Sequence, residues 1–122
     1  MAIEIAGLDV NSGLELCDGN KDIYVNSLRL YVSNIPKSLE KMKGVSEATL
    51  KDYAISVHGV KSISDYIGAQ EVKKTAKELE AMAKAGNLAG VLAKNETFIK
   101  YAQNLVNNIR IWLEKSELGV II

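Results

Sequence analysis

The chain has few of the residues on which many protein classes depend. Its 122 residues include one cysteine, one proline, one histidine, one tryptophan and one phenylalanine. The lone Cys17 excludes an intramolecular disulfide, which fits a reducing cytoplasm. The sequence has no Cys-x-x-Cys, no histidine pair and no Gly-rich phosphate loop, so it predicts neither a metal site nor a nucleotide site. We therefore expect no cofactor.

Charge of one sign and long apolar runs are missing as well. Fifteen basic residues balance fifteen acidic ones, whereas a nucleic-acid partner normally needs a basic face. No apolar stretch approaches the length of a membrane span, and the N-terminus lacks the basic start and apolar run of a signal peptide. We expect a cytoplasmic protein without nucleic-acid or membrane partners. The length indicates one domain over residues 1–122, with a core over about residues 7–116.

What the chain does have is helical periodicity. Few β-branched alternations and a single proline favour an all-α chain, and the apolar spacing predicts five helices. They cover about residues 9–17, 20–43, 46–68, 69–85 and 87–115, with Asp9, Ser46 and Asn87 as N-caps and Gly44 and Gly86 after helix ends. Pro36 should kink the second helix. The expected fold is an antiparallel four-helix bundle (up-down-up-down) with a short additional N-terminal helix. The apolar tail, residues 118–122, is left unassigned.

Each long helix has an apolar stripe that we expect to face the core. The stripes comprise Ile23, Leu28, Tyr31, Ile35 and Leu39; Leu50, Tyr53, Val57, Val60, Ser64 and Ile67; Val72, Ala76, Leu79 and Ala83; and Leu88, Leu92, Phe98, Ala102, Leu105, Ile109 and Trp112.

His58, the only histidine, lies outside the stripe of its helix. At about 100° per residue, Lys61 lies about 60° to one side of His58 and Ser62 about 40° to the other. The imidazole should therefore stand at the solvent boundary beside a cation and small residues, with room for an anion. The plainer interpretation is a surface histidine beside a solvated lysine, which is the usual role of such residues.

The segment from His58 to Ala69 carries a motif made of His58, Val60, Lys61, Ser64, Ile67, Gly68 and Ala69. In these residues it resembles the signature of the histidine phosphotransfer (HPt) domain. Ser62 stands where many members have glycine, and Ile63 is a looser match. The resemblance extends to the N-terminal entry, to the opening of the second helix and to the residues before the last helix, so it covers nearly the whole chain. The matching residues beyond the signature are Gly7–Val10, Gly13, Leu14, Gly19–Asp22, Leu79, Glu80 and Ala85–Asn87.

The resemblance implies a phosphocarrier without an ATP site of its own. His58 would accept a phosphoryl group on Nε2 from a receiver-domain aspartate and pass it to another receiver, with Lys61 stabilising the charge. The family's imidazole-orienting position corresponds to Glu80. The competing interpretation of Glu80 is an ordinary surface pair with Lys77 or Lys84. Ser62 is a candidate phosphate contact, with a plain packing role as the alternative.

The implied partners are response-regulator receiver domains, a hybrid histidine kinase, or both. The receiver would supply the aspartate and its Mg²⁺, and this chain would act as a monomer. Ile55, Gly59, Asp65 and Tyr66 are candidate docking residues, although Ile55 and Tyr66 could instead contact the second or the N-terminal helix. Three alternatives remain at this point: a receiver-binding adaptor with weak or no transfer, a purely structural bundle, and the phosphorylation domain of a larger chemotaxis-type kinase.

Overall fold

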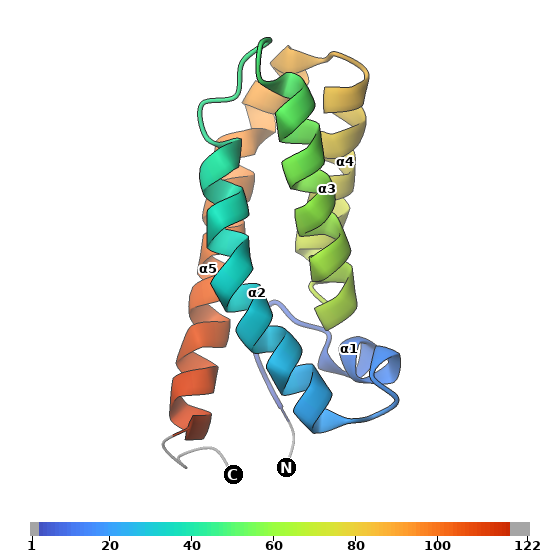
Figure 1. The fold of residues 1–122 in the computed structure, drawn as a ribbon, viewed down its shortest axis with the longest axis vertical. Coiled ribbons are helices and arrows are strands. Elements are labelled where there is room, and N and C mark those ends of the chain that lie inside the picture. The colour runs from blue at the N-terminus through green and yellow to red at the C-terminus, as the bar shows by residue number, and fades with distance from the viewer. Residues whose placement is uncertain (1–2, 118–122) are drawn as a thin grey trace.

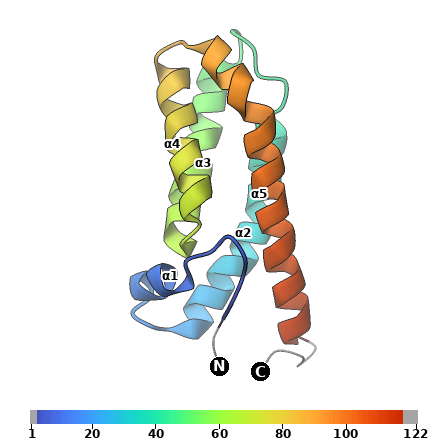
Figure 2. The same cartoon turned by 180° about the vertical axis from the view of Figure 1, so that it is seen from behind.

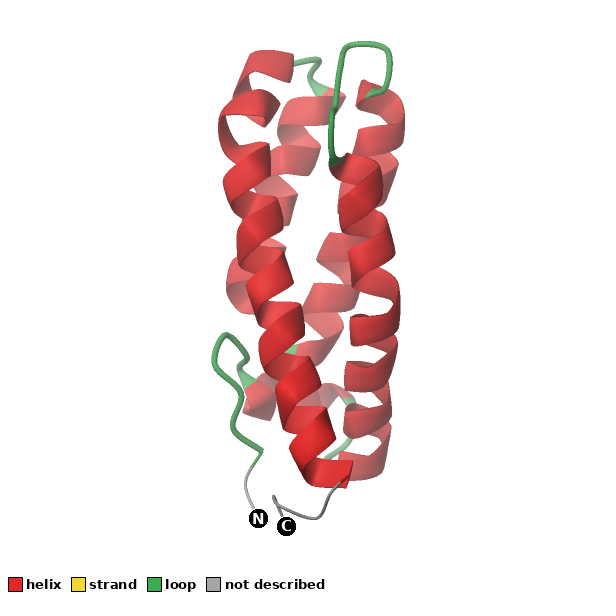
Figure 3. Cartoon of the chain, turned by 90° about the vertical axis from the view of Figure 1, so that its left-hand side faces the viewer, coloured by secondary structure: helices red, strands yellow, loops and turns green. Residues whose placement is uncertain are grey.

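The computed structural model describes residues 3–117, and this part of the chain is all-helical. Its helices are α1 (Val10–Leu16), α2 (Lys21–Met42), α3 (Leu50–Ile67), α4 (Gln70–Lys84) and α5 (Leu88–Glu117). Figure 3 shows helices joined by short loops, without a strand in the described residues. The all-α prediction is confirmed for these residues, whereas the unassigned tail at 118–122 lies outside them.

Side-chain caps define most of the helix starts. The Asp9, Asn20 and Asn87 side chains accept backbone N–H bonds at 3.2, 3.1 and 2.9 Å, each from the residue three positions later. The prediction of Ser46 as the cap of α3 is wrong, because Thr49 is the N-cap. The Ser46 N–H donates to Thr49 Oγ1 at 2.9 Å, and the Thr49 N–H donates back to the Ser46 carbonyl at 3.1 Å. These bonds close a turn ahead of the helix.

The long helices pack in a ring of neighbours. Helix α3 packs on α2 and α4, and α5 packs on the same two helices from the other side. Figures 1 and 2 show these helices side by side, with α1 lying across one end. Pro36 lies inside α2, and the first half of that helix leans away from the axis of the second half in Figure 1. Within residues 3–117, no helix has both the length and the apolar character needed to cross a bilayer.

Buried tyrosine hydroxyls form hydrogen bonds between helices inside the core. Tyr31 Oη lies 2.8 Å from Ser64 Oγ, which explains why a serine occupies the buried stripe of α3. Tyr53 donates to Asn95 Oδ1 at 2.9 Å, and Asn95 Nδ2 donates to the Met42 carbonyl at the same distance. Buried polar groups are tolerated when they are paired in this way.

The stripes of α3 and α4 are buried as predicted, but three stripe residues elsewhere are not. Leu88 is half-buried. Ile23 and Leu92 are exposed. Each stands beside a residue that takes the inward position instead, Tyr24 in α2 and Val91 in α5. One residue turns a helix by about 100°, so the burial of Tyr24 and Val91 turns Ile23 and Leu92 toward solvent.

Candidate functional site

His58 lies in α3 and faces away from the buried stripe. Its side chain is 57% exposed, whereas Val57 and Val60 on the same helix are fully buried. The solvent-boundary position predicted from helical spacing is therefore what the structure has. An exposed imidazole is open to a reacting partner without any rearrangement of the core.

Glu80 on α4 is the residue around which the site is built. Its carboxylate accepts hydrogen bonds from His58 Nδ1 at 2.7 Å and from Lys61 Nζ at 2.6 Å. A third donor, Lys84 Nζ, lies 3.1 Å from the same oxygen that binds His58. The Glu80 side chain is only 6% exposed. Three donors from two helices thus converge on one buried carboxylate.

These donors keep Glu80 ionised. Burial alone raises the pKa of its carboxyl, but hydrogen bonds from Lys61, Lys84 and His58 outweigh that effect and lower the pKa from 4.5 to about 2. An ionised carboxylate only accepts hydrogen bonds, so the proton in the His58 contact belongs to Nδ1. In the neutral ring this leaves Nε2 with the free lone pair.

The tight link between α3 and α4 brings Glu80 to His58. Gly68 ends α3 with φ of 83°, and a Cβ there would lie 2.0 Å from the Asp9 carbonyl oxygen. Lys73 pairs with Asp65 at 2.9 Å near the link, and His58 pairs with Glu80 farther from it. The two helices therefore run antiparallel, and the short link sets the register that aligns Glu80 with His58.

Ser62 and Gly59 flank the ring in different ways. The Ser62 hydroxyl donates to the His58 backbone carbonyl at 3.1 Å, so it is engaged with its own helix and not directed at a bound group. A phosphate contact by Ser62 would require that bond to break. A Cβ built on Gly59 meets nothing within 4 Å, so this position is open space beside the histidine.

The candidate docking residues Ile55, Gly59, Asp65 and Tyr66 differ in their exposure and in their contacts. Ile55 is strongly exposed. Tyr66 is also exposed, but its hydroxyl oxygen lies 3.8 Å from the Sγ atom of Cys17, the residue just after α1. The contact with the N-terminal helix region, left open from sequence, is therefore present for Tyr66. Asp65 is held in its ion pair with Lys73.

A groove between α2 and α3 adds apolar surface that the sequence reasoning missed. The residues that line this groove are Ser27, Leu30, Asn34, Ser62, Ile63, Tyr66 and Ile67. Helical spacing could have placed Leu30 outside the buried stripe of α2. It could not show which residues of α3 lie opposite Leu30.

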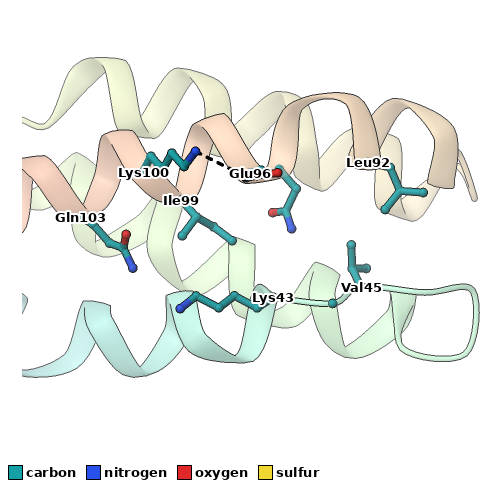
Figure 4. Close-up of a pocket in the computed structure, with 9 residues that line it drawn as sticks. Lys43, Val45, Leu92, Glu96, Ile99, Lys100 and Gln103 are labelled. Atoms are coloured by element: carbon teal, nitrogen blue, oxygen red, sulfur yellow. Dashed lines mark ion pairs between the residues drawn. The ribbon is translucent and has the colours of Figure 1, made fainter.

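A larger pocket lies away from His58, between the end of α2 and α5. It measures about 500 Å³, and Figure 4 shows Lys43, Ile99 and Lys100 at its walls. Lys100 pairs with Glu96 at 3.3 Å across one turn of α5. The side chain of Asn95, which also lines the pocket, already has both of its hydrogen-bond partners in the core. This pocket shares no lining residue with the His58 cluster.

Lys84 is the member of the cluster that sequence reasoning did not assign to the site. From the sequence, Lys84 is only a surface partner of Glu80, and that pair is an alternative to the orientation of the His58 imidazole by Glu80. The structure has both arrangements at once, because one carboxylate oxygen accepts from His58 and Lys84 together. The signal was the four-residue spacing between Glu80 and Lys84.

Comparison with known proteins adds no assignment. No family model, curated protein or solved structure matches the chain. Among residues 3–117, no group of three or more His, Cys, Asp or Glu side chains could hold a metal ion. The geometry of the His58 cluster is therefore the evidence for the function of this chain.

Proposed function

We propose that this chain is a histidine phosphotransfer protein that carries a phosphoryl group on His58. It would accept the group from the aspartate of a receiver domain and pass it to a second receiver, within the cytoplasm and as a monomer. The observation that carries the proposal is the Glu80 carboxylate at 2.7 Å from His58 Nδ1, with Lys61 on its other oxygen. An exposed imidazole with a fixed proton and a cation one turn away is suited to phosphoryl transfer.

The chemistry follows from the protonation of the ring. The lone pair of Nε2 attacks phosphorus, and the phosphorus–oxygen bond of the aspartyl phosphate breaks, with its electron pair leaving on the aspartate. The ring gains positive charge, and the Nδ1 proton stays in place against Glu80. The carboxylate stabilises that charge, while Lys61 offsets the negative charge on the phosphoryl oxygens. Mg²⁺ would come with the receiver.

The same proposal includes the finer fold, an up-down-up-down four-helix bundle with α1 as the additional helix. Two features support it: each long helix packs on two others, and a two-residue link joins the antiparallel α3 and α4. In such a bundle, His58 stands on an outer face in the middle of a helix, where a receiver can approach it.

The experiment is transfer from phosphorylated receiver domains to the purified chain and to His58→Gln. The proposal predicts an acid-labile, base-stable phosphoryl group on the wild-type chain and none on the variant, which should keep its helicity and its affinity for the receiver. If receivers bind the wild-type chain but leave it unlabelled, the protein is a docking adaptor. If they neither bind nor label it, the cluster is structural.

A further inference from the structure

Lys84 is the most exposed of the donors on Glu80 and has the longest contact with it. Its side chain is 67% exposed, against 26% for Lys61. Its distance to the carboxylate is 3.1 Å, against 2.6 Å for Lys61. An exposed lysine on a flexible stem can exchange partners without any rearrangement of the core.

The antiparallel register places the two lysines on opposite sides of the histidine. Lys61 stands one turn from His58 toward the C-terminal end of α3. Lys84 follows Glu80 by one turn in α4 and therefore lies toward the N-terminal end of α3. A group on the exposed edge of the ring would have an ammonium on each side along the helix axis.

Phosphorylation of the ring would add negative charge that a second cation, such as Lys84, can neutralise. The unmodified cluster contains one carboxylate and two ammonium groups. A phosphoryl group adds up to about two negative charges, and it would lie beside the ionised Glu80. With Lys61 alone, two neighbouring anions would share one cation, which is unfavourable.

We propose that Lys84 is the second cation of the phosphoryl site, held by Glu80 while His58 is free and transferred to the phosphoryl oxygens when Nε2 is phosphorylated. This inference rests on the proposed function for the identity of the phosphorylated atom. It adds a residue that binds the transferring group and a partner exchange at Glu80. Lys61, with the shorter contact, keeps its bond to the carboxylate and so keeps α3 and α4 connected. From there its charge still acts on the phosphoryl oxygens, at longer range than that of Lys84.

The test uses phosphoramidate, a small anionic donor that requires no receiver. Nε2 attacks its phosphorus, the phosphorus–nitrogen bond breaks, and ammonia leaves with the electron pair and a proton from solvent. Labelling rates of His58 are compared for the wild-type chain, Lys84→Gln, Lys84→Arg and Lys77→Gln. Lys77 is the matched control because it is an exposed lysine on the same helix, and its removal changes the net charge equally.

We expect Lys84→Gln to label roughly threefold to tenfold more slowly, with the difference shrinking as salt rises. Lys84→Arg should restore most of the rate, Lys77→Gln should match the wild type, and all variants should keep the helical content of the wild type by circular dichroism. Equal rates for Lys84→Gln and Lys77→Gln would overturn the inference, as would a wild-type chain that phosphoramidate does not label at His58. If phosphoramidate labels the wild type with the expected order of rates but receivers do not, the relay proposal fails and the Lys84 site stands.

Discussion

At the scale of single residues, Glu80 shows how a buried charge is kept. Removal from water penalises an isolated carboxylate heavily, and only charged donors in good geometry compensate for it. Glu80 has three such donors, and its lowered pKa follows from them. Losing the charge would therefore affect both the orientation of His58 and the stability of the α3–α4 pair.

Glu80→Gln tests this account at neutral pH. The amide keeps the volume but leaves Lys61 without a counter-ion, so we expect a loss of about 1–3 kcal/mol in the free energy of unfolding. Glu78→Gln is the matched control, because Glu78 is on the same helix and its pair with Lys94 is half-exposed. It should lose less than about 0.5 kcal/mol by urea denaturation.

The pH dependence of the same variant gives a second readout. The Glu80 pKa is lower in the folded chain, about 2, than the ordinary 4.5, so its stabilisation is complete above about pH 4.5 and is lost as the pH falls toward 2. The stability gap between wild type and Glu80→Gln should therefore narrow between pH 5 and pH 2.5. A gap that stays constant over this range would contradict the ionised, triply bonded carboxylate.

At the scale of elements, two helical glycines have opposite surroundings. A Cβ on Gly13 in α1 would lie 2.3 Å from the Tyr24 ring and 2.8 Å from the Ile67 carbonyl oxygen, whereas one on Gly59 in α3 meets open space. Gly13 therefore permits the close approach of α1 to the end of α3. Gly59 only weakens its helix, as glycine does in a helix interior.

Alanine substitution should separate these roles. Gly59→Ala should stabilise the chain by about 0.5–1 kcal/mol through helix propensity. Gly13→Ala should destabilise it by about 1–3 kcal/mol, since backbone and a buried ring would have to move. Thermal unfolding of both variants provides the measurement. A stabilising Gly13→Ala would show that α1 does not pack closely there.

Helical spacing predicted the faces of elements better than their starts. The whole stripe of α3 followed from spacing, because the pattern of one helix reports which of its sides is covered. The start of that helix did not, because Ser46 and Thr49 both had side chains able to cap and only their mutual bonds decided between them. The burial of Glu80 was also beyond the sequence, since it depends on how α4 is aligned against α3.

At the scale of the whole molecule, Asn95 connects three helices at one end of the bundle. It accepts from Tyr53 of α3 and donates to the Met42 carbonyl at the end of α2, and it belongs to α5 itself. The apolar pattern of α5 did not predict this network, because a polar residue such as Asn95 is normally expected at the edge of an apolar stripe and not inside the core. Only the assembled core reveals its partners.

Asn95→Ala should therefore destabilise the molecule by about 2–4 kcal/mol, because it leaves the Tyr53 hydroxyl and the Met42 carbonyl buried without partners. Asn104→Ala is the control, since Asn104 is exposed on the same helix, and it should change the stability by less than about 0.5 kcal/mol. Equal effects in urea denaturation would mean that the Asn95 bonds contribute nothing.

The most direct test of phosphoryl transfer through His58 is the position of the phosphoryl group on the imidazole ring. The wild-type chain, labelled with ¹⁵N in its single histidine, is incubated with a phosphorylated receiver domain and followed by NMR. We expect a phosphorus–nitrogen coupling at Nε2 of His58, with Nδ1 still bonded to its proton. Phosphorylation at Nδ1, or a folded chain that binds receivers but never gains the group, would contradict this expectation.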